Sequence, residues 1–464
     1  MSGPMALEPG GTEQDTLALR LAGTSVRRDD RTPALRPPGH GAGEEAVSRL
    51  AAELADRIGP AVHPYEVAAL LEAEGLTADQ IREGYGHPDL FSLAAALYEQ
   101  VPRTFPEPAP AADPWRPDHV RCLLRGVLFA LPGLAYLLTA PLWHPGRHTA
   151  SLIVAGLVSW AWGQGLGHRA HLRMAAGRRE AARTLLTGAP LGAALATVTA
   201  VPVRGDGPVI LAAAAQSLYL AAAGVLLVLA RERLLLAALT PLIAGAAVLP
   251  WWDPGTPLRT GLPLLALLAT LAVTGHALHG ALAAPAAADG KRPPLLWSLP
   301  YGLFGLAAGL LVLLEGRREP YAVIVLTVSM GPAEWLLYRY RGLTVAALRA
   351  STTPAGFLLR SVAVLGLCLP AYLLPLLPAA YLTGASPATL LLLAATLWTA
   401  LLLQAFGTAW PPAAICLAAA CAAGAVTLLH LPPGPVALPL CCGAAALSLV
   451  ACATRLLGRP ARHA

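Results

Sequence analysis

The feature that most limits the fold of this chain is an apolar stretch that runs from residue 119 to residue 456, with only short polar breaks. Residues 1–118 are polar by comparison. Only 13% of the 464 residues are charged, whereas a soluble globular protein carries roughly 25%. Because about 20 consecutive apolar residues suffice to cross the hydrocarbon core of a bilayer, this distribution predicts a polytopic membrane protein with a cytosolic extension.

The apolar stretch divides into about twelve segments of spanning length. We therefore predict an all-α fold with about 12 transmembrane helices in two six-helix bundles. The first set of expected spans is 120–142, 149–166, 184–203, 208–230, 234–250 and 261–283. The second set is 295–315, 321–338, 358–382, 387–407, 410–430 and 434–454. The polar segment 284–294 separates the two sets.

Basic residues in the loops predict how the spans are oriented. The first 40 residues contain no visible signal peptide, so we expect the N-terminus to stay in the cytosol. Fifteen Lys and Arg residues then fall in the inside loops and the C-terminal tail, and five fall in the outside loops. This positive-inside bias predicts a multi-pass protein of the plasma (cytoplasmic) membrane with a cytosolic N-terminus and C-terminus.

The remaining boundaries follow from shifts in composition. Residues 1–43 lack an apolar period and are predicted to be a disordered tail. Residues 44–104 contain segments with apolar residues at helical spacing and with helix start and stop signals, which predicts a small helical cytosolic domain. Residues 105–118 are a Pro-rich linker. The first transmembrane bundle is expected at 119–285, the second at 286–456 and a cytosolic tail at 457–464.

The predicted helical domain, residues 44–104, is acidic. It holds eleven Asp and Glu residues against four arginines. Part of it has a pattern that is superficially like a helix-turn-helix, but DNA affinity depends on neutralising phosphates, and an acidic surface repels them. We therefore expect no nucleic acid partner. The interpretation that we favour is a docking module for a cytosolic protein.

The sequence offers no constellation of residues for an enzyme. It contains no phosphate-binding glycine loop, no Asp-rich metal motif in an inside loop and no nucleophile elbow. The seven cysteines all fall within apolar spans without metal-ligand spacing, so we interpret them as packing residues. His276 and His279 are three residues apart, but no nearby carboxylate or cysteine completes a metal site. We expect no catalytic residue, no metal and no cofactor.

The segment GPAEWLLYRYR, which begins at Gly331, places a carboxylate inside a predicted span. An ionisable residue at the centre of a spanning helix costs at least about 2.5 kcal/mol, so Glu334 is expected to face protein or water and to have a partner. Arg360, at the start of the next span, is the partner that the sequence favours. Tyr338 lies four residues after Glu334 on the same helix face. Pro332 predicts a kink or local unwinding.

Two interpretations of these residues stay open. In the functional one, Glu334 and Arg360 line a polar cavity between the bundles together with Gln164, which occupies the position equivalent to Glu334 in the first bundle. Such a cavity would bind a charged head group or couple to a proton. In the structural one, Glu334 and Arg360 pin neighbouring helices at the cytosolic interface. The further candidates for cavity or substrate contact are Gln216, Tyr338 and Gln404.

The two sets of spans carry a faint similarity at an offset of 170 residues. VSWAWGQGLGHR (158–169) and VSMGPAEWLLYR (328–339) share a Val, a Ser and the final Arg at matching positions. Each segment lies where the second span of its set runs into a basic inside loop. We interpret this as two bundles related by an axis along the membrane normal.

Two basic segments, WGQGLGHRAHLRMAAGRREAARTLL and EWLLYRYRGLTVAAL, follow the second and eighth spans. With the two six-helix bundles, they make residues 119–456 resemble the multidrug/oligosaccharidyl-lipid/polysaccharide flippase superfamily. The resemblance is architectural. It implies a transporter or flippase that moves a lipid-linked or amphiphilic cell-envelope compound by rocking of the two bundles, with the lipid bilayer and that substrate as partners. The alternative is a non-transporting membrane scaffold for cell division or polar growth, which recruits a cytosolic protein through residues 44–104.

Overall fold

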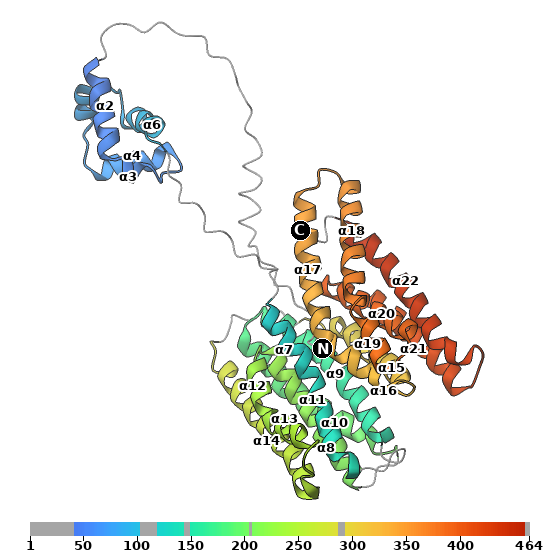
Figure 1. The fold of residues 1–464 in the computed structure, drawn as a ribbon. Helices are drawn as coiled ribbons and strands as arrows, with labels where there is room; N and C mark the ends of the chain where they lie inside the picture. Colours follow the sequence, from blue (N-terminus) through green and yellow to red (C-terminus); the bar gives the residue numbers. More distant parts are fainter. Residues whose placement is uncertain (1–40, 103–117, 143–148, 204–206, 286–292, 460–464) are drawn as a thin grey trace. The chain divides into compact units, whose positions relative to one another are not determined.

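The computed structural model describes residues 41–102, 118–142, 149–203, 207–285 and 293–459 (Figure 1). All secondary structure within these residues is helical. The described helices fall into two compact units, of which one contains α2–α6 and the other contains α7–α22. The predicted linker 105–118 except Asp118, and nearly all of the predicted tail 1–43, lie outside the described residues, as does most of the predicted tail 457–464.

The smaller unit consists of short helices around a core of its own. They are α2 (Gly41–Glu53), α3 (Ala55–Ile58), α4 (Pro64–Ala73), α5 (Ala78–Tyr85) and α6 (Leu90–Gln100). Thr77 and Asp89 begin α5 and α6 with capping boxes, in which the cap side chain and the side chain three residues later bond each other's backbone N–H groups. The apolar faces of the helices meet at the fully buried Leu71, Leu93 and Leu97.

The larger unit has two successive sets of helices. The first set, which we call the first bundle, comprises α7 (His119–Ala130), α8 (Gly133–Thr139), η1 (Ala140–Leu142), α9 (Thr149–Met174), α10 (Arg178–Ala200), α11 (Gly207–Val228), α12 (Glu232–Ala238), α13 (Thr240–Val248) and α14 (Gly255–Leu282). The second bundle comprises η2 (Leu295–Ser298), α15 (Leu299–Gly316), α16 (Pro320–Val328), α17 (Met330–Arg349), α18 (Pro354–Leu373), α19 (Leu376–Thr383), α20 (Pro387–Ala405), α21 (Trp410–Leu428), η3 (Gly434–Val436) and α22 (Ala437–Leu457).

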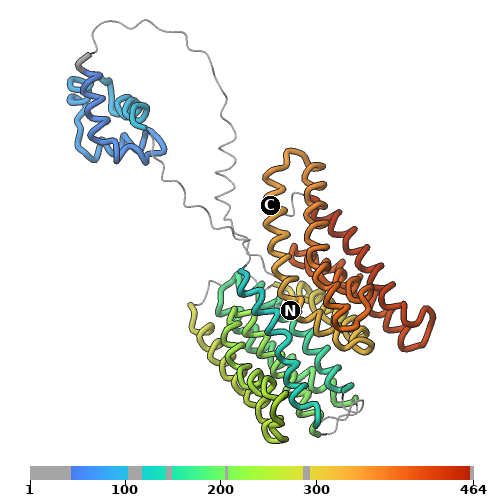
Figure 2. Tube along the Cα trace, viewed as in Figure 1, coloured from blue at the N-terminus to red at the C-terminus, as the bar shows by residue number. Residues whose placement is uncertain are grey.

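Each bundle packs around its own hydrophobic core. The largest core cluster draws all of its residues from α15–α22, and the next draws all of its residues from α7–α14. Figure 2 shows the same grouping, with the teal to yellow-green helices together and the orange to red helices together. Because the residues of each core come from a single bundle, each bundle can move as a rigid body.

Eight helices in the described part of the chain are long and apolar enough to cross a membrane, or up to nine if the bent pair α16–α17 forms one span. The described part of the chain is thus all-helical, with the span content of a polytopic membrane protein. The other three expected spans fall on α9, α10 and the pair α12–α13, which are not among these helices. Helices α9 and α10 are long but carry several arginines near the basic loop between them, and the chain breaks between α12 and α13, next to Pro241.

Helices α16 and α17 are bent by 41° where they meet at Ser329. Pro332 lacks the N–H that would bond the carbonyl of Val328, the residue four positions earlier, so the helix cannot continue straight through this point. The predicted kink in this span is therefore confirmed.

The bundles meet along two reciprocal contacts. Helix α9 packs on α15, and α7 packs on α16 and α17. In each case the first predicted span of one bundle contacts the second predicted span of the other. Glycines allow both crossings, because a Cβ on Gly126 would lie 3.0 Å from the backbone nitrogen of Gly331, and one on Gly302 would lie 3.3 Å from the carbonyl oxygen of Ala161.

Candidate functional site

Four charged side chains form a cluster where α7 meets the second bundle, and we call it the ion cluster: Arg121, Arg125, Glu232 and Glu334. Arg125 of α7 lies at its centre, with 7% of its side chain exposed. Its Nη1 donates to Oε1 of Glu334 on α17. Its Nη2 lies 2.8 Å from Oε1 of Glu232 on α12, and its Nε donates to the same oxygen at 3.0 Å.

Arg121 completes the ion cluster at its exposed edge. Its Nε donates to Oε1 of Glu232 at 2.8 Å, and 41% of its side chain is exposed. The cluster therefore balances two arginines against two carboxylates. Buried charges persist in a protein when they are paired in this way, because an unpaired one would lose its solvation without compensation.

Local sequence explains why these four side chains meet. Asp118 caps α7 by accepting from the backbone N–H of Arg121 at 3.1 Å. From this start, the two arginines lie one turn apart on the same helix face. Glu232 opens α12, where the helix dipole favours a negative charge.

The glycine contact between Gly126 and Gly331 brings α7 and α17 close enough for Arg125 to reach Glu334. Beside the ion cluster, the Nε1 of Trp335 donates to Nδ1 of His119 at 2.9 Å. A second hydrogen bond thus joins the same two helices.

The ion cluster corrects one prediction from the sequence. The partner of Glu334 is Arg125 of the first bundle rather than Arg360. Arg360 is exposed on α18. Glu334 lies near the start of α17, whereas Arg360 lies in the first half of α18, which follows the end of α17, so the two residues are far apart along these consecutive helices.

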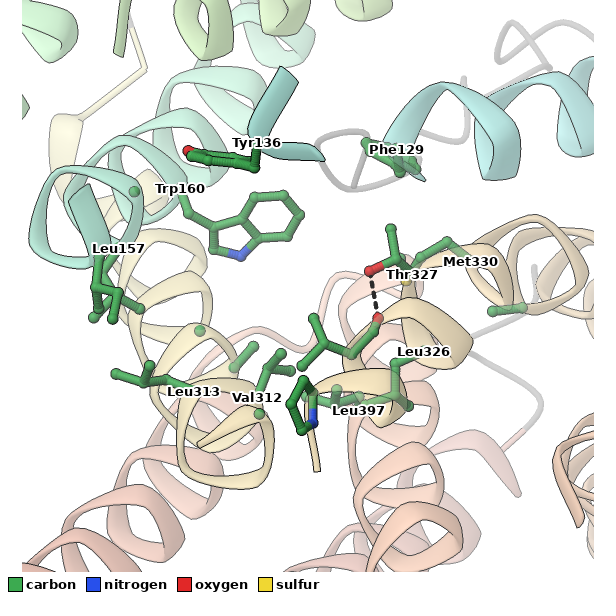
Figure 3. Close-up of a pocket in the computed structure, with 18 of the residues that line it drawn as sticks. Phe129, Tyr136, Leu157, Trp160, Val312, Leu313, Leu326, Thr327, Met330 and Leu397 are labelled. Atoms are coloured by element: carbon green, nitrogen blue, oxygen red, sulfur yellow. Dashed lines mark hydrogen bonds between the residues drawn. The ribbon is translucent and has the colours of Figure 1, made fainter. Parts of the chain in front are cut away.

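A cavity of about 650 Å³ lies between the two bundles (Figure 3). The first bundle contributes Phe129, Tyr136, Thr149, Leu152, Ile153, Gly156, Leu157, Trp160 and Gln216. The second contributes Ala308, Gly309, Val312, Leu313, Gly316, Pro320, Val323, Leu326, Thr327, Met330, Ala333, Tyr372, Leu397, Trp398 and Leu401. Figure 3 shows Tyr136 and Trp160 of the first bundle facing the same space as Thr327 of the second. None of the described residues that line this cavity is charged.

The cavity and the ion cluster are neighbours along the same two helices. On α17, Met330 and Ala333 line the cavity, and Glu334 is the next residue. On α7, Phe129 lines the cavity, and Arg125 lies one turn before it. The ion cluster therefore lies beyond one end of the cavity, on the side away from the connection between α15 and α16.

The structure separates the six candidate residues of the sequence. Gln216 alone among them lines the cavity. Glu334 belongs to the ion cluster, and Tyr338 is half-buried one turn beyond it. Gln164 is buried against Gly305 where α9 meets α15, and Gln404 is buried in α20. With the exposed Arg360, these residues do not form the single polar cavity that the functional interpretation expected.

The buried charged residues that the sequence pattern did not single out include Arg125, Glu232 and Glu315. Arg125 and Glu232 lie near the ends of predicted spans, where a charge costs little free energy, so their positions did not mark them out. Glu315, near the end of α15, is 1% exposed, and its Oε1 has no hydrogen-bond partner among the described residues. Glu315 is the last residue of its predicted span, 295–315, so its position offered no stronger signal than the positions of Arg125 and Glu232.

No protein-family model matches the chain, and no curated protein matches its sequence. Solved structures of transporters do match. A structure of the outward-facing conformation of a multidrug resistance MATE family transporter of the MOP superfamily has a TM-score of 0.42 at 12% identity, and the match covers 74% of this chain and 96% of that chain. A structure of MATE in complex with MaD3S has a TM-score of 0.40 at 15% identity, with 74% and 96% covered.

A structure of MATE in the bent conformation matches with a TM-score of 0.36 at 14% identity, covering 73% of this chain and 91% of that one. The similarity to these solved structures is structural, with low sequence identity. With scores this low, no function follows from the likeness.

Proposed function

We propose that this chain is a membrane transporter of the flippase type, which binds an amphiphilic compound in the cavity between its two bundles. The observation that carries the proposal is the cavity itself, about 650 Å³ in volume and lined by both bundles. Ligand sites of proteins commonly have volumes of about 300–1,000 Å³. When two rigid bodies that share a site rock against each other, the side of the membrane to which the site is open changes, as alternating access requires.

The ion cluster joins the two bundles beyond one end of the cavity and so closes that end. Arg125 holds the bundles together through Glu334, while Glu232 belongs to its own bundle. When the bundles separate, Arg125 keeps Glu232 as a partner and Glu334 meets water. Removing the partner of a buried charge costs about 3–5 kcal/mol, so this arrangement lowers the cost of opening.

The finer features of the proposal come from the sequence. Helices α9, α10 and the pair α12–α13 bring the spans to twelve. Both termini are cytosolic, so the ion cluster lies on the cytosolic side of the plasma membrane and the cavity lies toward the outside. The domain boundaries are those that the composition predicts, and the substrate is a lipid-linked or other amphiphilic cell-envelope compound. The process is transport, without a catalytic step.

Depletion of the protein tests this proposal. Cells without it should accumulate one amphiphilic envelope compound, measured by mass spectrometry of lipid extracts. Val312→Trp fills the cavity and should not restore the normal level, whereas Val362→Trp, at a 40% exposed position on α18, should restore it. An unchanged compound profile, or full rescue by Val312→Trp, would contradict transport through this cavity.

The smaller unit favours a second candidate function, that of a scaffold which recruits a cytosolic protein. A groove of about 720 Å³ on this unit is lined in part by three glutamates, Glu53, Glu74 and Glu83, beside Leu50, Leu76 and Arg49. Glu74 is paired with Arg57, so Glu53 and Glu83 give the groove its acidic character. Such a surface suits a basic amphipathic segment. If scaffolding is the function, deletion of residues 44–104 abolishes it and Val312→Trp is tolerated, which is the reverse of the result expected for transport.

A further inference from the structure

The chemistry of the cavity wall limits what it can hold. Its described lining is aliphatic and aromatic, with a few hydroxyl, indole and amide groups and no charged side chain. An ionised ligand group in this space would give up its hydration without gaining a counter-charge, which is costly. Rings such as Trp160 and Tyr136 attract a cation only weakly by comparison with a carboxylate.

The carboxylates of Glu315, Glu319 and Glu334 each adjoin a lining residue in sequence, but none of the three lines the cavity. Glu334, which follows the lining residue Ala333, is already paired with Arg125. Likewise, Arg125 is occupied by two carboxylates and is not free to pair with a phosphate. Neither charge of this pair is available to a ligand while the ion cluster is intact.

One polar side chain in the wall has an unused hydrogen-bonding atom. Gln216 of α11 donates from Nε2 to the carbonyl oxygen of Leu152 at 3.2 Å, which fixes its amide on the wall of the cavity. Its Oε1 is buried and has no hydrogen-bond partner among the described residues. A buried acceptor without a partner is unfavourable. Because Oε1 is covered, the amide must turn toward the cavity before a ligand can donate to it, and a ligand that does so gains more than one that does not.

We propose that the cavity takes an uncharged, mostly apolar compound that carries a hydrogen-bond donor, and that Gln216 is the residue that selects for the donor. The inference deepens the proposed transport function and rests on it. Where the substrate is larger than the cavity, the part that enters carries no charge.

A matched set of fluorescent probes tests this proposal on the purified full-length protein in nanodiscs. N-phenyl-1-naphthylamine is neutral and has one N–H donor. Its N-methyl derivative lacks the donor, and 8-anilinonaphthalene-1-sulfonate adds an anionic group to the same skeleton. Ethidium serves as the cation. Each probe is excited directly, and the signal of empty nanodiscs is subtracted.

We expect the neutral amine to bind saturably, and the sulfonate and ethidium to bind at least about 10-fold more weakly. The N-methyl derivative should bind about 5-fold more weakly than the amine, as the loss of one hydrogen bond of ordinary strength predicts. Gln216→Leu should reduce the affinity for the amine to that for the N-methyl derivative and leave the derivative unchanged. Gln404→Leu is the matched control, because Gln404 is buried but does not line the cavity.

The outcomes separate the two proposals. If ethidium or the sulfonate binds as tightly as the amine, and Val312→Trp abolishes that binding, the cavity is a binding site but the inferred substrate class is wrong. If Gln216→Leu leaves the preference for the amine intact, Gln216 does not select the donor. If no probe binds saturably, or if Val312→Trp changes nothing, the cavity itself fails as the binding site, and the proposed function fails with it.

Discussion

Arg125 shows at the scale of single residues what the sequence could and could not predict. The carboxylate of Glu334 was recognisable, because its cost within a span demands a partner. The partner was not, since it lies 209 positions away and is brought close by the packing of α7 on α17. Sequence proximity favoured Arg360, but only the packing of the helices decides which arginine faces the carboxylate.

Replacing the central arginine should destabilise the protein more than replacing one carboxylate. Arg125→Met leaves Glu334 buried without a partner and leaves Glu232 with Arg121 alone. We therefore expect the free energy of unfolding to fall by about 3–5 kcal/mol. Glu334→Gln leaves Arg125 paired with Glu232 and should cost less. Thermal unfolding of the purified protein in detergent measures both. Equal losses of stability would show that Arg125 does not hold the two carboxylates together.

At the residue scale, Asp253 makes the stability of the fold depend on pH. It lies in the connection between α13 and α14, where the backbone N–H of Gly255 and the guanidinium of Arg259 hold its pKa below its ordinary value. A carboxyl group whose pKa is lower in the folded state stabilises the fold above its unfolded-state pKa. That contribution is lost as the pH falls through the folded-state pKa.

The melting temperature of the wild type should therefore exceed that of Asp253→Asn at neutral pH, and the gap should close in acid. Melting curves of both proteins from pH 7 to pH 3 provide the measurement. A gap that stays constant across this range would mean that the stabilisation by Asp253 does not depend on its charge.

At the scale of secondary-structure elements, helices α16 and α17 show which features the local sequence predicts and which it does not. The Gly-Pro pair at 331–332 predicted a bend, and the bend lies at Ser329 where the missing N–H of Pro332 has its effect. The apolar stretches also predicted helices throughout. Sequence patterns did not reveal that the same glycine fits against Gly126 of α7, because that contact joins two spans that are far apart in the chain.

The contact between α7 and α17 leaves no room for a side chain. A Cβ on Gly126 would lie 3.0–3.1 Å from backbone atoms of the α16–α17 bend, so Gly126→Ala should cost about 1–3 kcal/mol. A Cβ added to Gly133 of α8 would meet no other atom within 4 Å, so Gly133→Ala should be neutral or slightly stabilising. Chemical unfolding of the two variants tests the difference. Equal tolerance of both alanines would mean that α7 and α17 do not approach this closely.

At the scale of the whole molecule, the sequence predicted two bundles and, in one interpretation, a polar cavity between them, whereas the cavity that the structure shows is mostly apolar. An apolar residue that lines a cavity has the same pattern as one that faces lipid or a core, so residues such as Val312 and Leu397 carried no signal. The polar candidates were the visible ones, and most of them lie elsewhere. The cavity arises from the crossing of α9 with α15 and of α7 with α16 and α17, which is a property of the assembled bundles.

The central claim is that the two bundles separate where the ion cluster holds them together, and the native Cys122 reports on this directly. Cys122 lies on α7, is 3% exposed and has its carbonyl against Gly331 of the other bundle. We would measure the rate at which a maleimide reagent labels Cys122 in purified protein whose other six cysteines are replaced by alanine. The rate is compared with and without the substitution Glu334→Gln. Cys416, buried inside the second bundle, is the control when retained alone. The account predicts that Glu334→Gln raises the labelling rate of Cys122 several-fold, since one buried ion pair no longer opposes opening, and leaves Cys416 protected. Labelling of Cys122 that does not change, or that rises equally at Cys416, would contradict it.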